Sequence, residues 1–217
     1  MKSPNDVTDN TRKRILATAE KLFAQKGYNG VSVREITQSA KCNLAAVNYH
    51  FGNKKNLYFD VFRYQLLPRL AEIETRFEDN LAKQTEINLE TIVRTLTLVF
   101  IEKHLNNLGN ESLNSMMHRE INNPTGAVEI VIKEGMVPFF EVLIKQLKPY
   151  LPENMDEIKI KLNIFSMIAM SLYFSLAQLP VTTITGKEYN ETFINQLTEH
   201  IVSFALHGLY GKSGEIC

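Results

Sequence analysis

The stretch "CNLAAVNYHFGNKKNLYFDVF", residues 42–62, predicts a short helix of mostly small, uncharged side chains, followed by a polar and aromatic cluster. Asn43 is a good N-cap for this helix, which runs to about His50. Gly52 and Asn53 are residues that end helices and form turns, and they follow immediately. Two lysines then open an aromatic-rich run. The stretch therefore joins a helix with little bulk or charge to groups that bind anions.

Two helices are predicted ahead of this stretch. The first carries an apolar side and ends at Gly27, and the second runs over Val33–Ala40 with Ser32 as its cap and Glu35 as the capping-box partner. Each of the three helices is too short to be stable alone, so they must pack together. The three-residue connection Lys41-Cys42-Asn43 joins the last two in the layout of a helix-turn-helix. In that motif the second helix lies in the DNA major groove.

The whole chain is predicted to be all-α. Apolar residues recur at intervals of three and four, and no run alternates with a period of two. A long helix is expected from residue 54 to about residue 80, and Pro68 should kink it. The later helices are predicted over residues 88–107, 111–121, 125–149, 155–179 and 188–209. The breaks between them are marked by Pro124, Pro149, Pro152, Pro180, Gly109 and Gly186. Pro138 lies inside the helix at 125–149 and should bend it.

Charge is distributed unevenly, although the formal net charge of the chain is zero. Residues 1–60 contain ten lysines and arginines and five aspartates and glutamates, which gives +5 and leaves −5 for the remainder. Such asymmetry suggests a polyanion-binding region attached to an acidic body. Chance clustering is the alternative, and charge alone does not exclude it.

Cellular location is inferred from three features. Two cysteines, Cys42 and Cys217, are too few for a disulfide framework and fit a reducing compartment. The N-terminus lacks the apolar core of a signal peptide. The charge-free stretch Leu162–Gly186 is long enough to span a membrane, but asparagine, serine, glutamine and proline interrupt it. A helix buried within a dimer explains it better, so we expect a cytoplasmic protein with no membrane partner.

Residues 12–62 resemble the DNA-binding domain of the TetR family of bacterial transcriptional regulators. The resemblance rests on "RILATAEKLFAQKGYNGVSVREI", with its long helix ending at Gly27-Tyr28, and on "VNYHFGNKKNLYFDV", in which His50-Phe51 is followed by Lys54. It implies a helix-turn-helix DNA-binding domain at 9–69, with the motif itself at 32–51. A helical ligand-binding and dimerisation domain at 70–217 is expected to follow.

The resemblance also implies which residues contact DNA. Tyr49, His50 and Lys54 match positions that contact phosphates, and the start of the second helix of the motif would face the bases. Lys54 also opens a helix, whose free N–H groups favour an anion. The full predicted set is Arg34, Asn43, Leu44, Ala45, Ala46, Asn48, Tyr49, His50 and Lys54.

Two positions depart from the commoner pattern of the family. Ala45 stands where many members have glycine, and Asn48 stands where they have tyrosine. Asn48 is a candidate for bonding adenine in the groove, with a cap or a phosphate contact as the alternative. Val47 and Phe51 are expected to be core. The operator sequence therefore cannot be transferred from other members.

The body of the protein is predicted to dimerise and to bind a small molecule. The helices at 155–179 and 188–209 are apolar on more than one face, and TetR-like regulators dimerise through their last two long helices, which agrees with this pattern. A dimer would read a pseudo-palindromic operator with half-sites about 34–36 Å apart. The stretch "HREINNPTGAVEIVIKEGMVPFF", residues 118–140, looks like the C-terminal domain of a subgroup with an "RE...PT.A" pattern. The predicted effector-binding residues are Met116, Met117, His118, Phe139, Phe140, Phe165, Met170, Tyr173 and Phe174.

Two other protein classes were weighed against this interpretation. An enzyme is disfavoured because the sequence contains no nucleophile motif, phosphate loop or dinucleotide fingerprint. Its histidines lack partners at metal-ligand spacing, so no metal and no cofactor is expected. A membrane-anchored helical protein depends only on the charge-free stretch. The resemblance thus implies a DNA-binding repressor that a small-molecule effector releases from its operator.

Overall fold

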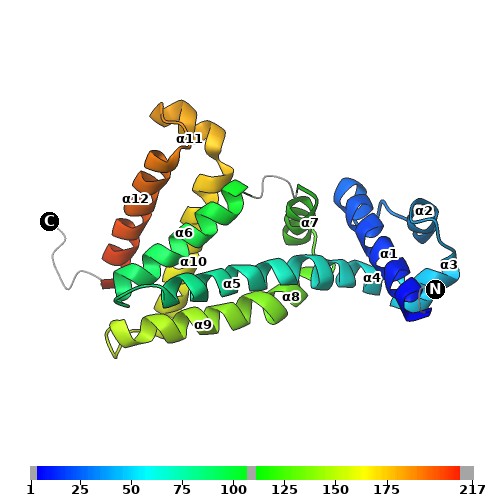
Figure 1. The fold of residues 1–217 in the computed structure, drawn as a ribbon, viewed down its shortest axis with the longest axis horizontal. Helices are drawn as coiled ribbons and strands as arrows, with labels where there is room; N and C mark the ends of the chain where they lie inside the picture. Colours follow the sequence, from blue (N-terminus) through cyan, green and yellow to red (C-terminus); the bar gives the residue numbers. More distant parts are fainter. Residues whose placement is uncertain (1–3, 107–110, 211–217) are drawn as a thin grey trace. The chain divides into compact units, whose positions relative to one another are not determined.

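The computed structural model describes residues 4–106 and 111–210, and this part of the chain is helical and contains no strand (Figure 1). The α-helices are α1 (Pro4–Lys26), α2 (Val33–Ser39), α3 (Leu44–Phe51), α4 (Lys54–Val61), α5 (Leu67–Ala82), α6 (Leu89–Asn106), α7 (Glu111–Asn122), α8 (Ala127–Val131), α9 (Val137–Leu147), α10 (Glu157–Leu176), α11 (Gln178–Thr185) and α12 (Glu191–Tyr210). A 3-10 turn, Lys148–Tyr150, follows α9. The all-α prediction is confirmed. Cys217, one of the two cysteines, lies outside the described residues.

Capping residues position the first helices. Ser32 and Asn43 have extended backbones, and their side-chain oxygens accept hydrogen bonds from the backbone N–H groups of Glu35 at 3.1 Å and Ala46 at 2.9 Å. Asn53 was predicted to end one helix. It is also the N-cap of α4, because its side chain accepts a backbone N–H from the first turn. Local side-chain chemistry therefore determines these boundaries.

Both prolines expected to bend a helix follow a π-helical turn. The π turn Phe62–Leu66 precedes Pro68, and the π turn Ile132–Met136 precedes Pro138 at the same offset. Proline lacks an N–H group and its ring crowds the carbonyl four residues back, and the wider π turn relieves this conflict. In the first case the N–H of Leu67 bonds to the carbonyl of Phe62, five residues earlier. The helices predicted at 54–80 and 125–149 each contain one such turn.

The described chain forms two compact units. The first contains residues 4–70 and also residues 111–137, which sequence reasoning had placed in the C-terminal domain. Its core combines side chains of α1–α4 with side chains of α7 and α8. The largest members from the first helices are Phe23, Tyr58 and Phe62, and α7 and α8 contribute Leu113, Met116, Ala127 and Val131. Residues from the middle of the chain thus complete the core around the helix-turn-helix.

The second unit contains residues 71–106 and 138–210. Within it α6 packs against α10 and α12, and these two also pack against each other (Figure 1). The ring of Phe139 lies 6.3 Å from the rings of both Phe77 and Phe100, measured between centroids. Arg94 on α6 forms ion pairs with Glu90 and with Glu199 on α12. Aromatic packing therefore joins α9 to α5 and α6, and an ionic cluster joins α6 to α12.

The region after α10 differs from the prediction. The helix expected at 155–179 ends at Leu176, and α11 follows it, although Pro180 was interpreted as a break. Pro180 is the third residue of α11, and the N–H groups of a first turn have no partner within the helix, so proline costs little there. By length and composition α10 qualifies as a membrane span, the one such helix among the described residues, and 28% of its apolar window is buried.

Candidate nucleic-acid interface

Helix α3 has one buried side and one exposed side. Val47 and Phe51 face the core of the first unit, as predicted. Ala45 and Asn48 are exposed, and Tyr49 has 78% of its surface accessible. Small side chains at the start of the exposed side let a helix approach the floor of the major groove. The geometry of α3 is therefore that of a helix that contacts a partner along its outer side.

The other predicted residues surround this exposed side. Leu44 is half exposed, and Ala46 is partly covered by the core. Arg34 is exposed in the first turn of α2, and Asn43 is exposed as the cap of α3. Arg34 and Asn43 are polar groups at the surface, whereas Leu44 is a large apolar side chain and Ala46 a small one. Their predicted DNA contacts stay open to test.

The connection between α2 and α3 is held by backbone geometry. Lys41 has a positive φ of 49°, which a lysine rarely adopts. The Arg14 guanidinium donates to the carbonyl of Ala40 at 2.7 Å, and the N–H of Cys42 donates to the carbonyl of Thr37 at 2.9 Å. Burial raises the pKa of the Cys42 thiol, with a smaller opposing effect from Arg14. Cys42 is therefore a packing residue of the turn, kept as a thiol.

Lys54 is held by an aromatic ring. Its Nζ atom lies 4.3 Å from the centroid of the Tyr28 ring, a cation–π contact. Burial lowers the pKa of the Lys54 ammonium. Sequence reasoning used Tyr28 only to mark the end of the first helix and missed this role. This contact gives the Lys54 ammonium a definite position at the start of α4, whereas an exposed lysine side chain would move freely.

Arg12 is a further residue that sequence reasoning did not select. Its guanidinium lies 4.0 Å from the centroid of the Tyr64 ring and 5.4 Å from that of Phe51, and it pairs with Asp60 at 3.1 Å. It thus ties α1 to the end of α3 and to α4. Its neighbour His50 is half-buried at that same end. The spacing of these residues in sequence offered no signal for the contact.

The surroundings of His50 disfavour the charged form of its imidazole in the free protein. Burial, and then the positive charge of Arg12, lower the pKa of its imidazole below the ordinary value. A phosphate beside the ring would favour the protonated form and raise that pKa in the complex. DNA-bound protein would then hold more protons than free protein, so affinity for DNA should rise as pH falls toward the lowered pKa.

We expect this pH effect to disappear in His50→Gln. The measurement is operator affinity at constant ionic strength between about pH 8 and about pH 5, the range in which histidine titrates. His118→Gln is the matched control, because His118 is exposed in the same unit and outside the predicted DNA contacts. An unchanged pH slope in His50→Gln would place the imidazole away from phosphate.

Glu120 and Thr125 of the "RE...PT.A" pattern belong to one hydrogen-bonded cluster in the first unit. Glu120 is 1% exposed, and its carboxylate accepts hydrogen bonds from the Thr125 hydroxyl at 2.8 Å, the Thr125 N–H at 3.0 Å and the Val128 N–H at 3.4 Å. It also accepts the Tyr58 hydroxyl of α4 at 2.9 Å. Arg119 extends to the end of α1, where it donates to the carbonyl of Gln25 at 3.4 Å. The motif therefore connects α7 and α8 with the helix-turn-helix region.

The nine predicted effector-binding residues are divided between the two units. Met116 is fully buried in the core of the first unit, Met117 packs against that core, and His118 is exposed. The rings of Phe140 and Phe165 are 4.5 Å apart between centroids. The six that belong to the second unit are Phe139, Phe140, Phe165, Met170, Tyr173 and Phe174. The effector site stays a prediction.

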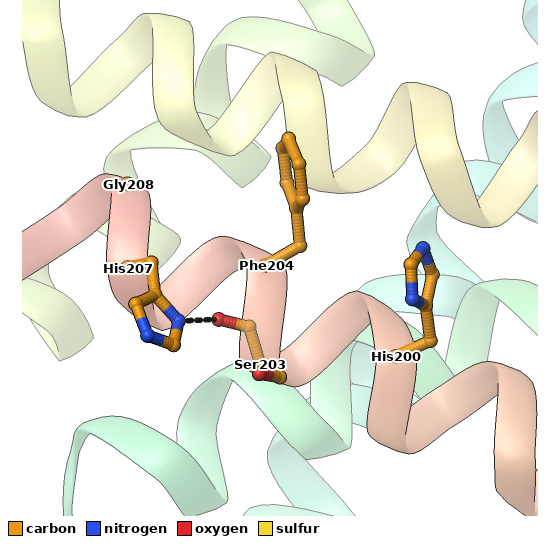
Figure 2. Close-up of a pocket in the computed structure, with 5 residues that line it drawn as sticks. All are labelled: His200, Ser203, Phe204, His207 and Gly208. Atoms are coloured by element: carbon orange, nitrogen blue, oxygen red, sulfur yellow. Dashed lines mark hydrogen bonds between the residues drawn. The ribbon is translucent and has the colours of Figure 1, made fainter. Parts of the chain in front are cut away.

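Exposed apolar side chains follow one side of α10. Their spacing of three, four and eight residues keeps them on a common stripe, which we call the α10 stripe: Ile158, Leu162, Phe165, Tyr173 and Leu176. On α12, Phe204 is also exposed and lines an open hollow of about 450 Å³ with His200, Ser203, His207 and Gly208. Figure 2 shows Phe204 and His200 projecting from the same side of α12. Monomers rarely leave apolar surface of this extent uncovered.

Two family models match the chain. Residues 15–61 match that of the bacterial regulatory proteins of the tetR family. Residues 86–209 match that of the C-terminal domain of the HTH-type transcriptional dual regulator CecR. The second match covers more than half of the chain and includes the cluster around Glu120.

Similar whole proteins agree with these matches. The HTH-type transcriptional dual regulator CecR of Shigella flexneri is 26% identical over 216 residues, covering 94% of this chain and 95% of that protein. The crystal structure of HlyIIR, a hemolysin II transcriptional regulator, aligns with a TM-score of 0.55 at 24% identity, covering 91% of this chain and 97% of that chain. AibR in complex with isovaleryl coenzyme A and operator DNA aligns with a TM-score of 0.55 at 19% identity, covering 89% and 97%. At such identities the structural similarity concerns the fold.

Proposed function

Because the chain belongs to the TetR family of bacterial regulatory proteins and carries a C-terminal domain of the CecR type, we propose that this transcriptional regulator is a cytoplasmic repressor that binds a pseudo-palindromic operator as a homodimer. The observation that carries the proposal is the exposed side of α3, where Ala45 lies in the first turn and the polar side chains of Asn48 and Tyr49 follow. A small-molecule effector in the C-terminal domain releases the protein from its operator.

DNA binding divides between base contacts and phosphate contacts. Leu44, Ala45 and Ala46 face the bases, and Asn48 bonds adenine or a phosphate. Arg34 and Asn43 bind the backbone from the flanks of α3, and the other phosphate contacts come from Tyr49, His50 and Lys54. Phosphate contacts contribute affinity for any sequence, whereas contacts in the groove discriminate between sequences. The net charge of +5 over residues 1–60 supports this assignment.

Dimerisation uses α10 and α12. The α10 stripe and Phe204 supply apolar surface for a second copy of the chain, and the absence of charge over much of α10 supports this. Two copies place two α3 helices in successive major grooves, which a monomer cannot do. Ser166 and Ala169 are small and exposed on α10, and they permit close approach of the partner helix.

The effector is a small apolar or amphiphilic molecule, and the six predicted residues of the second unit are its candidate contacts. Phe165 and Tyr173 also belong to the α10 stripe, so dimer contacts and effector contacts compete for them. The complex of AibR with isovaleryl coenzyme A and operator DNA is an example of the same fold with a ligand. Effector binding favours a conformation in which the helical path from Lys54 to Ala82 tilts, and the separation of the two α3 helices changes.

Genomic footprinting of the purified protein, with and without candidate amphiphiles, tests the proposed function directly. A repressor of this type should protect a discrete two-sided site, and an effector should abolish that protection. Protection of no site, or of DNA regardless of sequence, would contradict the proposal.

Lys54→Ala should weaken binding to every DNA sequence about equally. Removing one phosphate contact should also reduce the slope of log affinity against log salt by about one unit. Lys133→Ala is the matched control, because Lys133 is an exposed lysine of the same unit that pairs with Glu129 at 3.6 Å. Equal slopes in the wild type and Lys54→Ala would remove Lys54 from the interface.

An enzyme and a membrane protein remain the alternatives that experiments can reject. The described residues contain no group of three or more histidine, cysteine, aspartate or glutamate side chains that could hold a metal ion. Turnover of a substrate by the metal-free protein would argue for an enzyme. Recovery of the protein only in a detergent-extracted fraction would argue that α10 spans a membrane.

A further inference from the structure

The carboxylate of Glu120 is buried among hydrogen-bond donors. Four neutral donors surround it: the Tyr58 hydroxyl, the Thr125 hydroxyl and the N–H groups of Thr125 and Val128. Burying a carboxylate is costly unless hydrogen bonds compensate for the lost water. Three of the donors belong to the chain just after α7 and would satisfy much of this need. The fourth, from Tyr58, comes from a helix 62 residues away in sequence.

Tyr58 connects this carboxylate to other aromatic rings. Its ring lies 5.0 Å from the ring of Tyr28 and 4.8 Å from that of Phe23, measured between centroids. Burial, and then the hydrogen bond to Glu120, raise the pKa of the Tyr58 hydroxyl, so the group remains protonated and donates at neutral pH. Tyr28 is the same ring above which the Lys54 ammonium lies at 4.3 Å. A continuous series of contacts therefore joins Glu120 to Lys54.

The segment around Glu120 also holds the end of α1, which leads into Tyr28. The Ser115 hydroxyl donates to the carbonyl of Ala24 at 3.2 Å, and Arg119 donates to that of Gln25. The Arg119 side chain lies close beside Gly27, whose φ is +71°. The Tyr28 ring is thus fixed from two sides, by the end of α1 and by the Tyr58 ring.

We propose that Glu120 is a positioning residue for DNA binding, which holds Tyr58 and, through the Tyr58 and Tyr28 rings, determines where the Lys54 ammonium stands. The inference rests on the proposed function, because Lys54 matters here only if it binds a phosphate. Glu120 itself touches no DNA. It gives the CecR-type domain a direct effect on a phosphate contact of the DNA-binding helices.

Three substitutions separate positioning from general stability. Tyr58→Phe keeps an aromatic ring at this position but removes the hydroxyl by which Glu120 holds it, so the ring can shift relative to Tyr28. Glu120→Gln retains the shape of the side chain but changes two acceptors into one acceptor and one donor group. Thr125→Val is the matched control, because it removes a hydroxyl from the same carboxylate and leaves the contact with α4 intact.

The first measurement needs no DNA. Lysines are labelled by reductive ¹³C-methylation, and the Lys54 signal is identified by its loss in Lys54→Arg. The Tyr28 ring current should displace this signal in the wild type. We expect Tyr58→Phe and Glu120→Gln to move it toward the position of exposed lysines, and Thr125→Val to leave it unchanged. An unmoved Lys54 signal in Tyr58→Phe overturns the inference, whatever the protein binds.

The second measurement uses the operator fragment recovered by footprinting. Tyr58→Phe should weaken binding about fivefold to tenfold and reduce the salt slope by about one unit, although no charge has been removed. In a Lys54→Ala background Tyr58→Phe should cost nothing further, because the contact it positions is already lost. Equal losses in Tyr58→Phe and Thr125→Val, or additive losses with Lys54→Ala, overturn the inference. Failure of the wild type to bind any fragment refutes the proposed function instead.

Discussion

Replacing Leu162 with glutamate is expected to convert the proposed dimer into monomers and to lower operator affinity by about 100-fold or more. Leu162 is 60% exposed within the α10 stripe, so the substitution should leave the fold of a single copy intact. In a dimer the two-fold axis would bring the new carboxylates into apolar surroundings, where an unpaired charge is strongly unfavourable. Each monomer then has one α3 helix and loses the gain of binding two half-sites at once.

Sedimentation equilibrium and operator titration measure these two effects of the Leu162 substitution. Ile121→Glu is the control, since Ile121 has a similar exposure of 64% but lies on α7, outside the stripe. A dimer that survives in Leu162→Glu would show that α10 is not the interface. Loss of the dimer in both variants would point to a general effect of added negative charge.

Replacing Ala45 with glutamate is expected to lower operator affinity by about 100-fold, or about 3 kcal/mol, with little change in thermal stability. Ala45 is exposed in the first turn of α3, where a carboxylate costs nothing to the fold and is favoured by the helix N-terminus. In the complex the same carboxylate would be desolvated among the negative groups of DNA, and like-charge juxtaposition costs several kcal/mol. The substitution should therefore lower operator affinity while leaving thermal stability nearly unchanged.

Ala71→Glu is the control for the Ala45 substitution, because Ala71 is an exposed alanine of helix α5. It changes the net charge by the same amount and should change affinity only slightly at physiological salt. Operator titration and thermal unfolding of both variants provide the comparison. Equal affinities for the two variants would remove the start of α3 from the DNA interface.

The helical boundaries of the N-terminal region were predictable because their causes are local. Ser32 and Asn43 cap their helices with their own side chains, and Gly52 ends α3 in a positive-φ conformation. Val47 was predicted to be core and is buried, and the helical period places the next residue, Asn48, on the exposed side of α3. The turn and cap chemistry around α3 therefore needed no knowledge of distant residues.

Local features were less reliable where a proline was involved. Pro180 was interpreted as a helix break, yet it lies in the first turn of α11, where its missing N–H is not needed. Pro68 and Pro138 signalled irregular helices, but the π turns before them are an arrangement of the backbone that composition does not specify. The same residue type thus has two structural outcomes that depend on its position in a helix.

By itself the sequence determined the all-helical class, the helix-turn-helix with its exposed α3, and the apolar helices near the C-terminus. Periodicity, caps and charge are properties of residues close together in the sequence, so they can be identified from the order of residues alone. Only the tertiary structure decided that residues 111–137 complete the core around α1–α4, that Lys54 lies above Tyr28, and that Glu120 accepts the Tyr58 hydroxyl. Those contacts join residues far apart in the chain, so they depend on how the whole unit packs. Packing brings the Tyr58 hydroxyl to the buried Glu120 carboxylate, which is costly to bury without hydrogen bonds.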